Sequence, residues 1–135
     1  MGKEKVEKIK EEVRRFKEGI NEKFFVERVI IFGSAAKGEM KKDSDIDIIV
    51  VSKKFGRKDF FKITPKFYDE WHLKQKINYP VDILLFDTRE FNKLKKEVSI
   101  VSEALREGIE IWCYLQTIIQ FGSATLNLGA KNSRS

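Results

Sequence analysis

The sequence predicts an α+β domain, α/β-like in character, with a small mixed β-sheet and helices packed mainly on one side. Three short apolar segments bounded by turn residues indicate strands at residues 26–32, 45–51 and 81–86. In other segments, apolar residues recur at the three- and four-residue spacing of amphipathic helices. Short strands that alternate with helices favour a layered domain over an all-helical or an all-β one.

The longer helices are expected in the first two thirds of the chain. A helix is predicted over residues 4–24, and residues 35–40 should form a short helix or turn after the first strand. Residues 58–76 are helical in pattern, and Pro65 is expected to begin a new helix there. The apolar residues of this last segment are candidate core residues: Phe60, Phe61, Phe67, Trp71 and Leu73.

The elements after the third strand are shorter. Thr88 is expected to cap a short helix, residues 97–107 to form another that a glycine ends, and residues 109–112 to add a strand. The chain then changes in composition, because its last part contains no Asp or Glu and is rich in Ser, Thr, Asn and Gln. We therefore divide it into a domain over residues 1–113 and a C-terminal extension over residues 114–135.

Length and composition indicate one domain that can bury a core without disulfides. The chain has 135 residues, 41% of them hydrophobic, and its single cysteine, Cys113, has no partner within the chain. The charged N-terminal segment lacks the apolar stretch of a signal peptide, and no apolar run approaches the length that spans a membrane. We expect a cytoplasmic protein with no membrane partner.

The net charge of +6 is unevenly distributed. The first 30 residues interleave Lys or Arg with Glu, a pattern typical of a solvated helix face. The excess of positive charge lies between Lys53 and Lys76, and such a face attracts any polyanion, a nucleoside triphosphate included. Nucleic acid is an alternative partner on this evidence, although not the favoured one.

Three carboxylates stand near the beginnings of two predicted strands. Asp45 and Asp47 are two residues apart, so their side chains project from the same face of one strand. Two adjacent carboxylates repel each other, and a divalent cation such as Mg²⁺ resolves that conflict. If the third strand pairs beside the second, Asp82 reaches the same cluster. Three such carboxylates can hold two metal ions for phosphoryl displacement.

A turn before these strands supplies the other half of a candidate site. The first strand ends at Gly33-Ser34, where glycine permits a tight turn and close approach of a ligand. Backbone N–H groups and the Ser34 hydroxyl at the start of a helix favour an anion there. Gly-Ser alone is a weak signal, since Gly122-Ser123 repeats it with no acid after it.

The combination is specific. Gly33-Ser34, ten intervening residues and then Asp45-Ile46-Asp47 resembles the signature of the DNA polymerase beta-type nucleotidyltransferase superfamily, above all its minimal nucleotidyltransferases. The resemblance covers roughly residues 20–110 and implies the nucleotidyltransferase fold. It implies that Asp45 and Asp47 bind metal and that Asp82 is the third carboxylate, which also helps to deprotonate the attacking hydroxyl.

One departure from the family concerns phosphate binding. Family members often have an arginine in the segment after Gly-Ser, where this sequence has Ala35, Ala36 and Lys37. A lysine meets phosphate as a point charge but lacks the bidentate fork of arginine. Lys37 is therefore a candidate for phosphate contact together with Gly33 and Ser34.

The expected activity is Mg²⁺-dependent transfer of a nucleoside monophosphate, AMP from ATP, to an acceptor hydroxyl. The resemblance to antitoxins that modify a tyrosine of a small helical HEPN ribonuclease makes such a toxin the expected acceptor. The alternatives are a non-catalytic module that binds nucleotide or a partner, and transfer to RNA or a small molecule. Apolar positions in the extension are compatible with a homodimer.

Overall fold

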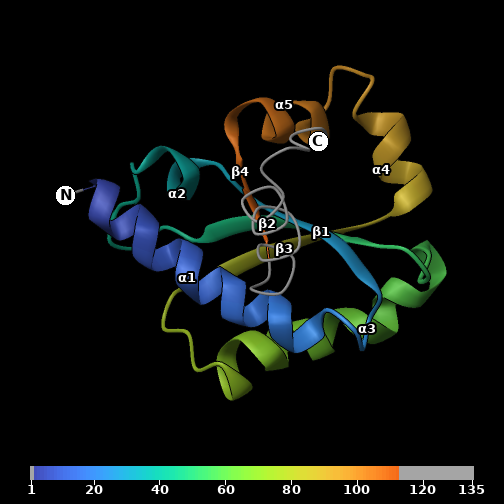
Figure 1. The fold of residues 1–135 in the computed structure, drawn as a ribbon, viewed down its shortest axis with the longest axis horizontal. Helices are drawn as coiled ribbons and strands as arrows, with labels where there is room; N and C mark the ends of the chain where they lie inside the picture. The colour runs from blue at the N-terminus through green and yellow to red at the C-terminus, as the bar shows by residue number, and fades with distance from the viewer. Residues whose placement is uncertain (1, 113–135) are drawn as a thin grey trace, which may run out of the picture.

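The computed structural model describes residues 2–112, which form a four-stranded mixed β-sheet flanked by helices (Figure 1). The order of the strands in the sheet is β3-β2-β1-β4. The three strands predicted from the sequence are confirmed to within one residue at each end, and the predicted fourth is present as well. The strands are β1 (Val26–Phe32), β2 (Ile46–Ser52), β3 (Val81–Asp87) and β4 (Ile109–Ile111).

The pairing of the strands determines which residues lie side by side. β1 is antiparallel to β2, and Phe32 is the partner of Asp47. β2 is parallel to β3, and Asp47 is also the partner of Asp82. β4 pairs antiparallel with the other side of β1. A parallel pair needs a long crossover connection, and residues 53–80 provide it here.

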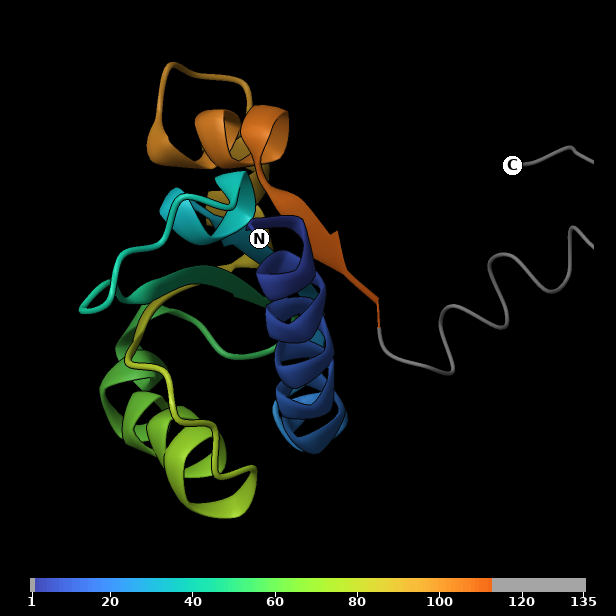
Figure 2. The same cartoon turned by 90° about the vertical axis from the view of Figure 1, so that its left-hand side faces the viewer.

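Helices lie on both faces of the sheet, the longer ones on one face (Figure 2). The first face is covered by α1 (Gly2–Ile20), α3 (Arg57–Asp69) and the π-helix η1 (Glu70–Lys74). The second is covered by α4 (Thr88–Leu94) and α5 (Ile100–Glu107). The expected main layer of helices is thus joined by a smaller layer on the opposite face.

Alternating side chains of the strands fill two separate cores. On the side of α1 and α3, edge-to-face aromatic contacts join Phe16 to Phe67 and to Trp71, all three of them fully buried. On the side of α4 and α5, Ile49 of β2 packs with Phe91. β2 is buried on both faces, and this explains why its sequence turns wholly apolar after Asp47.

The middle helix corrects two predictions. Pro65 lies inside α3 and does not begin a new helix. A proline there leaves the carbonyl of Phe61 without its N–H donor, but Phe61 is 90% exposed, so water can replace that donor. Phe61 and Leu73 are also wrong as core residues, since Leu73 is 66% exposed. Phe67 and Trp71 are confirmed in the core.

The helices after β3 begin at different residues from those expected. Asp87 caps α4, because its carboxylate accepts the N–H of Glu90 at 2.7 Å, and Thr88 is the first helical residue. The Thr88 hydroxyl donates instead to Glu27 at 2.8 Å. α5 begins three residues later than predicted, where Ser99 caps it, and it ends at Gly108 as expected.

Some predictions fall on residues that the structure does not describe. Cys113 and the extension over residues 114–135 lie outside the described range. Within residues 2–112, no helix has the length and apolar character needed to cross a membrane.

Two neighbouring apolar residues of η1 give a direct test of the packing. The Trp71 ring is fully buried and its indole N–H donates to the Tyr79 carbonyl at 2.8 Å. We expect Trp71→Ala to lower the free energy of unfolding by roughly 3–5 kcal/mol. Leu73→Ala, at an exposed position, should change it by no more than about 0.5 kcal/mol. Urea unfolding measures both, and equal midpoints for the two variants would contradict the described packing.

Candidate active site

The turn that ends β1 lies directly against one of the predicted acids. Gly33 has a φ of 72° and a ψ of −153°, a conformation that glycine adopts at little cost and that other residues essentially do not adopt. It also precedes α2 (Ser34–Lys37), which no side chain of the described residues caps. A Cβ atom on Gly33 would lie 2.7 Å from Oδ2 of Asp47. The turn therefore needs glycine both for its conformation and for the space that the carboxylate occupies.

The parallel strands bring two acids together. Asp47 and Asp82 each follow the first residue of their strand, and the register makes them direct partners. The third strand does pair beside the second, which was the condition for Asp82 to join the other two acids. Asp45 precedes β2, and the N–H of Ile46 donates to the Pro80 carbonyl at 2.8 Å, which ties this segment to the start of β3.

The acids share the sheet face that carries α4 and α5. Side chains alternate along a strand, so Asp47 projects on the same side as Ile49, and Asp82 on the same side as Leu84. The two apolar residues pack into the core beneath α4 and α5. At the other end of the same strands, Asp47 is half-buried and Asp45 and Asp82 are exposed. This end of the face is accessible to a ligand.

The site carries negative charge without a compensating protein cation. Partial burial raises the pKa of Asp47 above its ordinary value, and the charges of Asp82 and Asp45 raise it further. Within residues 2–112, no Lys or Arg forms an ion pair with any of the three. The negative charges of the three carboxylates repel one another, and a bound cation would reduce that repulsion.

The donor set fits a hard divalent cation. All three side chains offer carboxylate oxygens, the ligands that Mg²⁺ prefers. In the described part of the chain, no three His, Cys, Asp or Glu side chains already stand in a metal-holding arrangement. Because Asp45 and Asp82 are exposed, rotation of their side chains toward Asp47 is what would complete such a site.

Lys37 is engaged away from the acids. Its ammonium forms an ion pair with Glu107 at the end of α5, with Nζ 3.4 Å from Oε1. Both side chains are nearly half exposed, and an ion pair of that kind is worth no more than about 1 kcal/mol. The structure therefore brings Gly33 to Asp47 and places Ser34 next in the chain at the start of α2, but it pairs Lys37 with Glu107.

Two neighbours of the acids were not identified from the sequence. Phe32 lies opposite Asp47 and forms the apolar wall on the side of β1. The Tyr68 hydroxyl of α3 accepts the N–H of Ile83, next to Asp82, at 3.1 Å. This bond satisfies an outward-facing donor of the edge strand β3. Neither neighbour carries a sequence signal, because both depend on which elements pack together.

The comparisons with known proteins agree with this geometry. A relative from Methanocaldococcus jannaschii, named a putative protein adenylyltransferase, is 39% identical over 80 residues, which are 56% of this chain and 83% of that protein. The crystal structure of a putative nucleotidyltransferase from Sulfolobus solfataricus has a TM-score of 0.55 at 22% identity and covers 85% of this chain and 89% of that one. At that identity the likeness concerns the fold.

A more distant likeness is to a toxin-antitoxin structure with AMP-PNP, at 16% identity and a TM-score of 0.48, over 89% of this chain and 86% of that one. It is too distant to bear on fold or function. The decisive match is to the family described as nucleotidyltransferase domain, which extends over residues 6–111 and so includes the Gly33 turn and all three acids. The chain therefore belongs to the nucleotidyltransferase domain family and is a nucleotidyltransferase.

Proposed function

We propose that the protein is a Mg²⁺-dependent adenylyltransferase, which moves AMP from ATP to a hydroxyl group of a second protein and releases pyrophosphate. The observation that carries this proposal is the register of β2 and β3, which sets Asp47 opposite Asp82 beside the Gly33 turn. Carboxylates on one side and a turn without a Cβ on the other form a place for a metal-bound phosphate chain.

Asp45, Asp47 and Asp82 are the proposed ligands of two Mg²⁺ ions. Bound there, the metal would supply electrostatic stabilisation of the phosphate charge that develops during transfer. The three side chains have no cationic partner among the described residues, and this charge imbalance supports the assignment. The protein's own part is then to position the two reactants.

The transfer forms a bond between the acceptor oxygen and the α-phosphorus of ATP. The bond from that phosphorus to the oxygen bridging to the β-phosphate breaks, and pyrophosphate leaves with the electron pair. The hydroxyl proton needs an acceptor close to the reacting oxygen. Asp82 is the proposed base, because it is the exposed carboxylate directly beside Asp47.

Gly33 and Ser34 are the proposed contacts of the triphosphate. The turn at Gly33 brings the backbone against the Asp47 carboxylate without a clash, and Ser34 adds a hydroxyl at the start of α2. Lys37 is the proposed cationic contact of the triphosphate, and it has to exchange Glu107 for the nucleotide. That exchange costs little, since the ion pair is half exposed.

The proposed acceptor is a protein hydroxyl. The support is the relative from Methanocaldococcus jannaschii, whose name describes protein adenylyl transfer and which this chain covers over most of its length. The sequence resemblance to antitoxins of HEPN toxins makes a small helical HEPN protein the first acceptor to test.

The proposal is tested by incubating the protein with α-labelled ATP, Mg²⁺ and a small helical HEPN protein as the candidate acceptor. We expect label on that protein and a mass gain equal to whole AMP units. Asp47→Asn should reduce the labelling rate by about 100-fold or more, because it removes charge at the reacting phosphate. Asp87→Asn is the matched control, since Asn also caps a helix well. Equal rates for both variants would disprove the assignment of Asp47.

Stability provides a readout that does not depend on turnover. The raised pKa of Asp47 means that its ionised form is disfavoured in the folded state. Near neutral pH the ionised carboxylate therefore lowers the free energy of unfolding. This loss of stability disappears as the pH falls through the raised pKa and the group becomes protonated. We expect Asp47→Asn to melt a few degrees above the wild type in chelator at neutral pH, with the difference shrinking in acid.

The addition of Mg²⁺ should reverse this order. At ten times its dissociation constant, an ion that binds only the folded state adds about 1.4 kcal/mol. We expect that gain in the wild type and a much smaller one in Asp47→Asn, measured by thermal melting with and without the ion. If Mg²⁺ does not change the melting temperature of the wild type, the proposed metal site is contradicted, whatever the acceptor is.

The Gly33 turn can be tested against the second glycine with a positive φ in this segment. Gly38 ends α2 with a φ of 73° and a ψ of 23°, the left-handed helical conformation, which alanine adopts at a cost of roughly 1–2 kcal/mol. Gly33 has a φ of 72° and a ψ of −153°, a region open essentially to glycine alone, and a Cβ atom there would also meet the Asp47 carboxylate. We expect Gly33→Ala to lose most of the labelling activity and to unfold at a lower urea concentration than Gly38→Ala, which should retain activity. Equal labelling by the two variants, measured where both are folded, would contradict the proposed role of the turn.

A further inference from the structure

A second charged region lies at the opposite end of the sheet from the three acids. A cavity of about 600 Å³ opens beyond the C-terminal ends of β2 and β3. Lys53 and Lys54 line it after β2, and Arg89 lines it from the first turn of α4. From Asp47 to Ser52 the strand advances five residues, or about 17 Å. The cavity is therefore distinct from the proposed active site.

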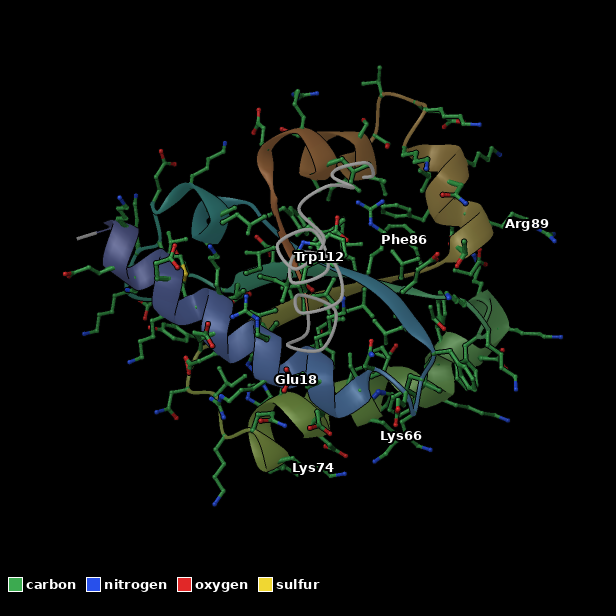
Figure 3. The ribbon with its side chains drawn as sticks, viewed as in Figure 1. Glu18, Lys66, Lys74, Phe86, Arg89 and Trp112 are labelled. Carbon is green, nitrogen blue, oxygen red and sulfur yellow. The ribbon has the colours of Figure 1, made fainter. Side chains whose placement is uncertain are left out.

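A line of lysines continues from this cavity along α3. Lys58, Lys62 and Lys66 follow one another at four-residue intervals, so they share one side of the helix, and all three are exposed. Successive members are about 6 Å apart along the helix axis. Figure 3 shows Lys66 and Arg89 toward the same end of the molecule, away from α2. We call Lys53, Lys54, Arg89 and these three lysines the basic surface.

The positive charge of the basic surface is not neutralised within the protein. Among residues 2–112, none of its six members forms an ion pair. The carboxylates nearby have other roles: Asp87 caps α4, and Glu90 pairs with Arg57. In α3, helical spacing places Asp59 beside Lys62 and Asp69 beside Lys66, and the Asp59 carboxylate accepts the N–H of Gly56 at the start of the helix.

Exposed aromatic rings lie among these cations. Phe61 is between Lys58 and Lys62 in α3 and is 90% exposed, although no packing role requires a phenylalanine there. Phe25 is 43% exposed, and the Lys54 ammonium lies 4.7 Å from the centre of its ring. Rings interleaved with cations are the arrangement on which unstacked bases pack while lysines meet the phosphates.

We propose that the basic surface binds single-stranded nucleic acid without sequence preference. The lysines of α3 follow the phosphate backbone, the 600 Å³ cavity receives a phosphate or nucleotide near Arg89, and Phe61 stacks against a base. The regular spacing of the lysines and the exposed ring favour this ligand over an acidic protein surface, which needs neither. The surface is separate from the carboxylates, so this binding is a property beyond the proposed transfer reaction.

The test is fluorescence anisotropy of the full chain with a labelled 20-nucleotide oligouridylate at several salt concentrations. The combined variant Lys58→Ala, Lys62→Ala and Lys66→Ala should reduce the slope of log affinity against log salt by about two and weaken binding on the order of 100-fold at 50 mM salt. The matched control is Lys8→Ala, Lys95→Ala and Lys96→Ala, which removes the same charge from exposed positions in α1 and after α4 and should retain most of the affinity.

Single substitutions separate stacking from charge. Phe61→Ala should weaken oligouridylate binding about tenfold. Val98→Ala, at another fully exposed apolar position, should leave binding unchanged, and so should Asp47→Asn. Equal losses in the two triple variants would overturn the proposal, because net charge alone would then explain binding. It would also be overturned if Phe61→Ala had no effect and polyglutamate of the same length competed as well as the oligouridylate, since the surface would then serve an acidic protein.

Discussion

The parallel pairing of β2 with β3 is the constraint on which the rest of the site depends. It sets Asp47 and Asp82 side by side at one end of two strands whose remaining residues are almost wholly apolar. The cores on both faces of β2 hold that register, because a shift by one residue would turn Asp47 toward the face that α1 and α3 cover. Repulsion between the carboxylates is thus maintained by hydrophobic burial elsewhere in the sheet. A binding site for a cation is the expected outcome of that balance.

The sheet separates two charged regions of opposite sign. The acids lie where β2 and β3 begin, and the basic surface lies where they end and continues along α3. The buried strands between them keep the two regions at a fixed distance, so neither charge can neutralise the other by a local rearrangement. A polyanion approaching this protein therefore meets attraction at one end and, unless metal is bound, repulsion at the other. This arrangement favours binding of a long anion away from the three acids.

The sequence was sufficient for the parts of the fold that follow from local periodicity. The strands, α1 and the neighbourhood of Asp47 and Asp82 could be predicted, because apolar runs and the positions of acids within them are visible in one dimension. The sequence did not predict that α3 continues through Pro65, because this depends on which side of the helix is exposed to water. The same holds for Phe61, which has the spacing of a core residue but lies beyond the edge of the packed face. The Lys37 ion pair with Glu107 and the hydrogen bond from Ile83 to Tyr68 join elements whose proximity only the assembled fold defines.

That hydrogen bond has a consequence for how a second protein can approach. β3 is an edge strand, and an edge with unpaired N–H groups is a template on which an incoming chain adds a further strand. Tyr68 occupies the donor of Ile83, immediately after Asp82, and α3 stands beside the strand. That hydrogen bond and the neighbouring helix disfavour the addition of an extended peptide to the sheet next to Asp82. In the proposed reaction this arrangement favours an acceptor that presents its hydroxyl on a projecting side chain over one that adds a strand to the sheet, so the shape of the acceptor surface would be a basis of selection.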